Sequence, residues 1–261
     1  MFDFHMHTRV SFDGHDTGEA MAKAALAAGL KEICFTDHLD YDPLEKMLGM
    51  TFDNEVYSAE YDHLEVPGLT IRRGMEFGMT PYNLDQFKKD LQRRPFDFVL
   101  GSIHFADDLD VYFPEYWSDK TVFEAERRYL ETTLQCLQIH NDFDVLAHLT
   151  YIAKALSHAA PRPVPFAEHR EIIDEILRLV AAKGKGLELN TSGMDRCGGF
   201  LPTADYFRRF KELGGEIITI GSDAHDTKRV GQYAFDVCEI FKDIFGYVCT
   251  FENRKPIFHK L

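Results

Sequence analysis

Short apolar runs that favour β-strands alternate with longer helical patterns along all 261 residues of the chain. The sequence predicts strands over residues 1–5, 32–36, 70–75, 98–103, 143–147, 186–190 and 216–221, with 248–251 as an eighth, edge-like element. Strand–helix alternation of this kind is typical of a parallel sheet covered by helices. Chain length and strand count favour one α/β barrel domain over an open sheet.

The intervening segments have helical spacing and helix-ending residues. We predict helices over residues 17–28, 84–94, 119–139, 166–183, 203–213 and 233–245, and several of these are followed directly by glycine. Residues 39–66 are rich in acids and aromatics and follow a strand end. We therefore predict that they form an active-site loop or lid.

Ligand-type side chains follow six of the seven predicted strands. His5 and His7 end the first strand, and because residues i and i+2 of a strand point to the same side, they can share one metal ion. The other strand-end residues are His38, Glu76, His104, His148, Asp223 and His225. In a parallel barrel the carboxyl ends of all strands meet on one face, so these residues should converge. With Asp13, which lies shortly after the first strand, they predict a metal centre.

Nine candidate ligands are too many for a single tetrahedral ion. They suit two or three divalent ions, with carboxylates available as bridges. Sites built from nitrogen and oxygen donors accept several divalent metals, so zinc, manganese and iron all fit the sequence.

Composition narrows the class of protein. A net charge of −14 argues against a nucleic-acid partner or an anionic membrane surface. We see neither a signal peptide nor an apolar run long enough to cross a bilayer. None of the five cysteines forms a C-x-x-C pair, which predicts a reduced, cytoplasmic protein. The sequence does not indicate an oligomeric state.

The segments that carry the candidate ligands resemble the polymerase-and-histidinol-phosphatase (PHP) superfamily. They read H-M-H-T with S-F-D-G, F-T-D-H, G-M-E, G-S-I-H, A-H-L and G-S-D-A-H. The segment E-L-N-T-S-G further resembles bacterial histidinol-phosphate phosphatases. The resemblance implies a distorted seven-stranded (β/α)7 barrel over residues 1–261 and a trinuclear site. It also implies hydrolysis of L-histidinol phosphate by in-line attack of a metal-bound hydroxide.

The resemblance assigns the ligands position by position. One ion takes His5, His7, Glu76 and Asp223. A second shares Glu76 and adds His104 and His148. A third takes Asp13, His38 and His225. Many members of the superfamily have a histidine where this chain has Asp13, and the nearby His15 is a second candidate for that position.

Residues beyond the ligands should bind the substrate. Arg196, which follows the sixth strand, is the predicted phosphate-binding cation, with Lys154 and Arg229 as secondary candidates. His225 and Asp223 are the nearest candidates for delivering a proton to the leaving group. Acids that could hold the cationic amine of histidinol lie on the loops after His38 and His104, at Asp40, Asp42, Asp107, Asp108 and Asp110. Asp37 is expected to accept hydrogen bonds rather than to bind metal.

Three alternatives remain at this point. The same ligands could serve a phosphoesterase acting on sugar or nucleotide phosphates or on a small diester. A metal-dependent amidohydrolase also begins with an H-x-H pair, but that class often uses a bridging lysine on the fourth strand, and residues 98–104 contain none. Some PHP domains attached to polymerases are thought to be non-catalytic, but those have usually lost ligands.

Overall fold

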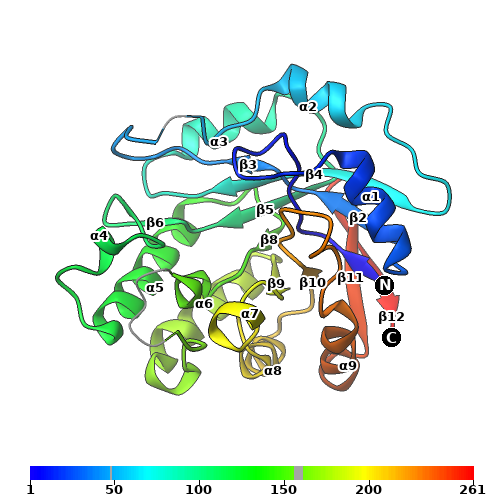
Figure 1. The fold of residues 1–261 in the computed structure, drawn as a ribbon. Helices are drawn as coiled ribbons and strands as arrows, with labels where there is room; N and C mark the ends of the chain where they lie inside the picture. The colour runs from blue at the N-terminus through cyan, green and yellow to red at the C-terminus, as the bar shows by residue number, and fades with distance from the viewer. Residues whose placement is uncertain (48, 156–160) are drawn as a thin grey trace.

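A computed structural model describes residues 1–47, 49–155 and 161–261 as one α/β domain with a nearly closed barrel of seven parallel strands (Figure 1). The strands, in barrel order, are β1 (Phe2–Asp3), β2 (Glu32–Phe35), β4 (Thr70–Gly78), β5 (Phe98–Ser102), β8 (Val145–Leu146), β9 (Gly186–Asn190) and β10 (Ile218–Gly221). Backbone hydrogen bonds next to β1 and β10 close the ring, because Phe4 N–H donates to Ile220 O at 2.8 Å. The predicted barrel is confirmed.

Helices pack around the outside of the barrel (Figure 1). The six predicted helices are present as α1 (Gly18–Ala27), α3 (Leu84–Leu91), α5 (Val122–Ile139), α6 (Arg170–Ala182), α8 (Ala204–Glu212) and α9 (Ala234–Ile244). Local chemistry sets their ends: Thr121 and Glu124 form a capping box at the start of α5. Gly29, with φ of 80°, follows α1 in the left-handed conformation that favours glycine. A short 3-10 turn, η2 (Phe166–Glu168), takes up the beginning of the predicted 166–183 helix.

The segment over 39–66 is more ordered than predicted. It begins within the short strand β3 (His38–Leu39), which pairs with β4, and contains the helix α2 (Asn54–Tyr61). Asp53 caps α2 by accepting from two backbone N–H groups. Tyr57 and Tyr61, four residues apart, are buried on one face of α2. The prediction of an active-site loop or lid thus did not include the helix α2 or the pairing of β3; residue 48 lies outside the described residues.

The predicted eighth strand does not lie at an edge of the barrel. β11 (Tyr247–Glu252) pairs antiparallel with β12 (Lys255–Lys260) in a separate hairpin. The hairpin turn lies against the amino-terminal ends of the barrel strands, where Arg254 N–H donates to Asp97 O at 2.8 Å and its guanidinium donates to the Asp144 carboxylate. The hairpin thus covers the end of the barrel opposite the strand carboxyl ends.

Side chains inside the barrel form an apolar layer below a polar one. The apolar layer consists of Phe4, Cys34, Phe98, Leu100, Val145, Ala147 and Phe251. Because alternate residues of a strand point inward, barrel strands also carry polar inward side chains toward their carboxyl ends, such as Glu76 on β4 and Glu188 on β9. The β3–β4 register sets His38 opposite Glu76. Within the described ranges, no helix is long and apolar enough to cross a bilayer.

Candidate metal centre

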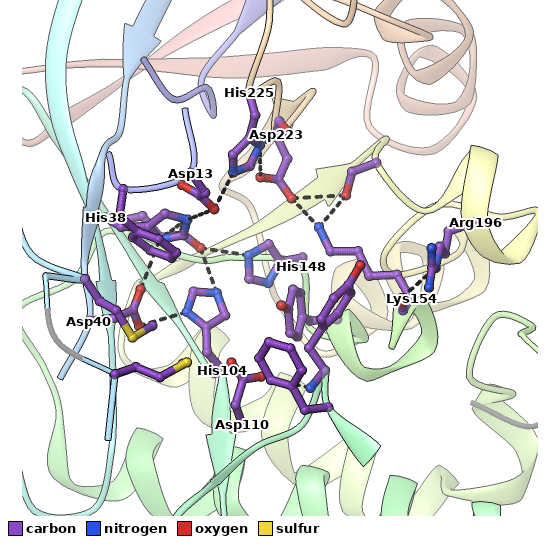
Figure 2. A pocket seen from close by; sticks show the side chains of 18 of the residues that line it. Asp13, His38, Asp40, His104, Asp110, His148, Lys154, Arg196, Asp223 and His225 are labelled. Atoms are coloured by element: carbon purple, nitrogen blue, oxygen red, sulfur yellow. Dashed lines mark hydrogen bonds and ion pairs between the residues drawn. The ribbon is translucent and has the colours of Figure 1, made fainter. Parts of the chain in front are cut away.

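The nine predicted ligands gather at the carboxyl-terminal end of the barrel, and Figure 2 labels six of them around one cavity. They come from separate elements: His5 and His7 follow β1, Asp13 precedes α1, His38 lies in β3, Glu76 in β4, His104 follows β5, His148 follows β8, and Asp223 and His225 follow β10. Four overlapping groups of these residues, together with Asp40, place ligand atoms within 4.8 Å of one another. The expected convergence is therefore present in the structure.

The Glu76 carboxylate lies in the middle of the cluster and is fully buried. Its Oε2 atom is 3.1 Å from His5 Nε2 and 3.4 Å from His7 Nε2. Its Oε1 atom is 2.8 Å from His148 Nε2 and 3.3 Å from His104 Nε2. Burial alone would raise the pKa of Glu76, yet the imidazoles around it hold that pKa well below its ordinary value. The carboxylate is ionised, with Oε2 directed at His5 and His7 and Oε1 directed at His104 and His148.

Asp223 completes a group on one side of Glu76. Its Oδ1 atom is 3.3 Å from His7 Nε2 and 3.6 Å from His5 Nε2. The two Nε2 atoms of His5 and His7 are only 3.1 Å apart in a site closed to solvent. Two ring nitrogens that face each other next to two carboxylates need a shared proton or cation between them. The donor set fits a divalent metal ion.

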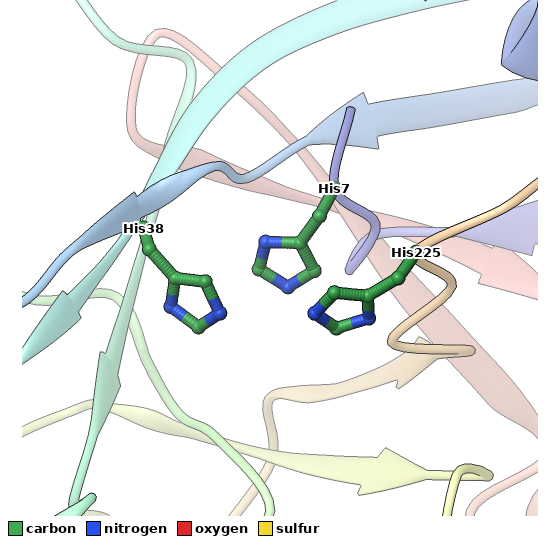
Figure 3. Close-up of side chains that lie close together, drawn as sticks. All are labelled: His7, His38 and His225. Carbon is green, nitrogen blue, oxygen red and sulfur yellow. The ribbon is translucent and has the colours of Figure 1, made fainter. Parts of the chain in front are cut away.

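A third group surrounds Asp13. The rings of His7 and His225 stack at 4.3 Å, and those of His7 and His38 at 4.2 Å (Figure 3). Asp13 Oδ2 is 3.1 Å from His225 Nε2 and 3.6 Å from His38 Nε2. Among the described residues, no group hydrogen-bonds to the buried Asp13 Oδ1 atom. His15 is exposed, and no described side-chain contact joins it to the cluster, whereas Asp13 contacts both His225 and His38, so the geometry favours Asp13 over His15.

The electrostatics of this third group also suit a cation. Burial, and then the neighbouring His38 and His225, lower the pKa of His7 to about 3, so His7 is neutral and offers a lone pair. Burial opposes ionisation of Asp13, but its hydrogen bond with His225 and the nearby His38 hold its pKa below the ordinary value. Burial lowers the pKa of His38, but Glu76 and Asp40 raise it to about 9, so metal binding at this ring must displace a proton.

Two buried carboxylates orient the imidazoles. His5 Nδ1 donates to Glu188 Oε1 at 2.7 Å, and His104 Nδ1 donates to Asp40 Oδ1 at 2.8 Å. Because a carboxylate can only accept, each Nδ1 carries a proton, and each Nε2 is directed at the centre, where it holds a second proton or binds a metal ion. The sequence analysis gave Glu188 no role. The sequence does contain a feature that indicates it: Glu188 is a charged residue within a largely apolar strand, and it lies two positions before Asn190, so both side chains point to the same face.

His7 is oriented by a longer chain of hydrogen bonds. Its Nδ1 atom lies 3.2 Å from Ser11 Oγ, which donates to Asp37 Oδ1 at 2.9 Å. Asp37 also accepts from Thr8 N at 2.9 Å and from the Tyr61 hydroxyl at 2.5 Å. Asp37 therefore accepts hydrogen bonds behind the centre, as expected. Tyr61 links this network to the α2 helix that the sequence analysis missed.

Two glycines leave room for the orienting carboxylates. A Cβ atom on Gly78 would lie 1.7 Å from Asp40 Oδ1, and one on Gly221 would lie 2.0 Å from Glu188 Oε1. Neither contact is possible between real atoms. The absence of a side chain at these two strand ends is thus a requirement of the site.

The cluster opens into a cavity of about 580 Å³ with a cationic wall (Figure 2). Lys154 Nζ lies 2.6 Å from Asp223 Oδ2 and 3.0 Å from Ser192 Oγ. Arg196, which the sequence ranked first, donates from Nε to Lys154 O at 3.1 Å. Arg229 also lines the cavity but is paired with Asp195 at 2.6 Å. Lys154 is thus the cation in closest contact with the cluster.

Other parts of the cavity wall carry apolar side chains and an acid from the loop after His104. The apolar ones are Phe12, Met47, Met50 and Phe113, and the acid is Asp110. Burial raises the pKa of Asp110. Asp107 is paired with Arg128 at 2.6 Å and, like Asp108, lines a different hollow. Asp42 accepts from backbone N–H groups of its own loop. Of the acids predicted on these loops, Asp110 and the buried Asp40 border the cavity.

Comparison with known proteins agrees with this geometry. The family model of the PHP domain matches residues 3–192. A histidinol-phosphatase of Lactococcus lactis is 35% identical over 234 residues, which cover 87% of this chain and 85% of that protein. A probable histidinol-phosphatase of Thermotoga maritima is 29% identical over 264 residues and covers 100% of both chains.

Solved structures agree as well. The crystal structure of the Lactococcus lactis histidinol phosphate phosphatase, complexed with zinc, L-histidinol and phosphate, matches with a TM-score of 0.83 at 30% identity and covers 98% of each chain. A putative histidinol phosphatase from Listeria monocytogenes shares the fold, with a TM-score of 0.78 at 20% identity over 90% of this chain and 99% of that one. The chain belongs to the PHP family.

Proposed function

We propose that this chain is a metal-dependent phosphomonoesterase that hydrolyses L-histidinol phosphate to L-histidinol and phosphate. The observation that carries the proposal is the set of imidazole Nε2 atoms directed at buried carboxylates, beside a cavity wall with Lys154 and Arg196. The similarity along almost the whole chain to a phosphatase crystallised with zinc, L-histidinol and phosphate supports the substrate.

We further propose that the centre holds two or three divalent ions. The first would be held by His5, His7, Glu76 and Asp223, the second by Glu76, His104 and His148, and the third by Asp13, His38 and His225. Zinc is supported by the relative's structure, and manganese or iron suits the same donors. When bound, such ions supply Lewis-acid chemistry that activates water and offsets the charge of the phosphoryl group.

The chain's own residues then bind and orient the ester. The Lys154 ammonium, the Ser192 hydroxyl and the Arg196 guanidinium lie on one wall and can donate hydrogen bonds to phosphoryl oxygens. His225 and Asp223 remain our candidates for protonating the leaving alkoxide. Because His225 Nδ1 donates to the Asp223 backbone carbonyl, Nε2 is the ring atom left to deliver a proton. His225 could therefore act as the donor only in the two-ion form of the centre, in which it binds no metal.

Asp110 supports a substrate with a cationic amine. Asp110 lies on the cavity wall and forms no ion pair among the described contacts, whereas Asp195, another acid on that wall, is paired with Arg229. Aromatic side chains nearby, Tyr112 and Phe113, offer faces for the imidazole ring of histidinol. Two further properties, a cytoplasmic location and the lack of a nucleic-acid partner, remain predictions from the sequence.

A substrate panel tests the proposed function. Purified protein supplied with zinc, manganese or iron is assayed for phosphate release from L-histidinol phosphate, sugar phosphates, nucleotide monophosphates and one diester. A kcat/KM at least about 100-fold higher for L-histidinol phosphate, worth about 2.7 kcal/mol, is expected. Equal rates across the monoesters would support a phosphatase but contradict L-histidinol phosphate as its specific substrate. The absence of phosphate release from every ester would contradict the proposed phosphatase function.

Loss of a proposed ligand should abolish activity without unfolding the protein. His104→Ala removes an imidazole whose Nε2 atom lies 3.3 Å from Glu76 Oε1 and whose Nδ1 atom is held by Asp40. We expect kcat to fall more than about 100-fold, beyond the effect typical for an outer partner of a ligand. Metal content and circular dichroism are measured in parallel, with the exposed His63→Ala as the control. Full activity in His104→Ala would exclude it from the site.

Filling the space next to Asp40 should weaken metal binding. Gly78→Ala places a methyl group where Asp40 Oδ1 lies and so displaces the carboxylate that orients His104. Metal affinity, measured by competition with a chelator, should fall about 10–100-fold. Asp40→Asn, which keeps the shape and removes the charge, should change affinity in the same direction. Wild-type affinity in both variants would contradict this role for Asp40.

Arg196→Ala should mainly weaken the binding of phosphate esters. The guanidinium lines the cavity and has no carboxylate partner among the described ion pairs. Loss of one charge-assisted hydrogen bond, worth about 1.5–3 kcal/mol, should raise KM about 10–100-fold and weaken inhibition by inorganic phosphate. The exposed Arg208→Ala serves as the control, and unchanged kinetics in Arg196→Ala would refute the assignment.

Asp110→Asn should affect only substrates with an amine. We expect KM for L-histidinol phosphate to rise about 10–100-fold, because one hydrogen bond to a charged group is lost. KM for p-nitrophenyl phosphate, which has no cationic group, should stay the same. Asp108→Asn, outside the cavity, is the matched control. An equal change for both esters would show that Asp110 does not recognise the amine.

A further inference from the structure

Tyr151 occupies a fixed position on the cavity wall. It begins the 3-10 turn η1 (Tyr151–Lys154), and its N–H donates to His148 O at 2.7 Å. The centroid of its ring is 5.1 Å from that of His148 and 5.0 Å from that of His104. The Lys154 ammonium lies 4.9 Å from the ring centroid on the same turn. Packing against two proposed ligands and one cation therefore holds the ring in place.

The hydroxyl of Tyr151 differs from those of the fully buried tyrosines. Those hydroxyls donate within the protein: Tyr57 to Gly74 O, Tyr61 to Asp37, Tyr116 to Ala125 O, Tyr129 to Ile103 O and Tyr206 to Val164 O. A tyrosine with most of its ring covered usually finds such a partner. Over residues 1–47, 49–155 and 161–261, no group hydrogen-bonds to the Tyr151 hydroxyl, although the side chain lines the cavity.

The ring contacts of Tyr151 locate its side chain within the cavity. On one side is Lys154, whose ammonium lies 4.9 Å from the ring centroid and 2.6 Å from Asp223 Oδ2. On the other side is Tyr112, whose ring centroid lies 6.5 Å from that of Tyr151 and whose backbone N–H donates to Asp110 Oδ1 at 2.9 Å. In Figure 2, Asp223 and Asp110 lie at opposite sides of the labelled residues. The Tyr151 side chain therefore lies between the wall proposed for the phosphoryl group and the acid proposed for the amine. In a phosphate monoester, the ester oxygen joins those two parts.

We propose that the Tyr151 hydroxyl donates a hydrogen bond to the ester oxygen of the bound substrate. The inference rests on the proposed phosphatase function. During hydrolysis, water oxygen bonds to phosphorus and the bond from phosphorus to the ester oxygen breaks, so its electron pair moves onto that oxygen. A donor held in place before the reaction stabilises this charge. Tyr151 keeps its own proton, and the alkoxide takes one from His225 Nε2 in the two-ion form of the centre, or from water where His225 binds a metal ion.

The test compares a poor leaving group with a good one. Tyr151→Phe removes only the hydroxyl, and kcat is measured for L-histidinol phosphate, an alkyl ester, and for p-nitrophenyl phosphate, an aryl ester. Alkyl oxygen accumulates more charge when it leaves, so kcat for the alkyl ester should fall about 10²–10³-fold. The aryl ester should lose less than about 10-fold, because its oxide needs little stabilisation. KM and the inhibition constant of inorganic phosphate should stay unchanged.

Controls separate this role from a structural one. Tyr116→Phe removes a buried hydroxyl far from the cavity and should leave the kinetics of both esters unchanged. The metal content and melting temperature of Tyr151→Phe should match those of the wild type, since the lost hydroxyl binds no described residue. A clearly lower melting temperature, an equal loss on both esters, or no loss at all would each overturn the proposal. Wild-type protein that hydrolyses neither ester would instead overturn the proposed function.

Discussion

The burial of the Glu76 carboxylate is the constraint on which the rest of the site depends. A charge closed off from water is stable only when positive charge or several hydrogen-bond donors surround it. Around Glu76 the neighbours are imidazoles, and two of these, His5 and His104, have their ring protons turned outward to other carboxylates. What faces Glu76 is therefore a set of ring nitrogens that can each hold a second proton or a metal ion. Cations or additional protons must occupy the centre, and metal ions compete with protons for it.

Orientation of the ligands depends on space as much as on hydrogen bonding. Asp40 and Glu188 fix His104 and His5, and they can do so because Gly78 and Gly221 carry no side chains. Inward-facing residues of a barrel strand lie close to those of the neighbouring strands. A carboxylate that reaches behind a ligand must therefore take the volume of a neighbouring side chain. Gly78, the last residue of the segment G-M-E-F-G, and Gly221, the first residue of G-S-D-A-H, leave the volume that these two carboxylates occupy.

The sequence predicted the barrel and the convergence of its strand ends because both follow from short-range patterns. Apolar runs of the right length identify strands, and parallel strands bring their carboxyl ends together. The α2 helix was missed because polar and charged residues surround the two buried tyrosines that hold it in place. The role of Glu188 depends on which face of β9 points inward and on the empty volume at Gly221. Those features exist only after the strands are packed.

The charge of the site explains how an acidic protein can bind a phosphate ester. The chain has a net charge of −14, and the proposed ligands include the carboxylates of Asp13, Glu76 and Asp223. Two or three divalent ions carry more positive charge than these three carboxylates carry negative charge, so the loaded centre is locally cationic. Lys154, 2.6 Å from Asp223, adds to that field on the cavity side. Attraction of the phosphoryl group would thus depend on local charge, and in the proposed function Asp110 would face the cationic leaving group at the opposite side.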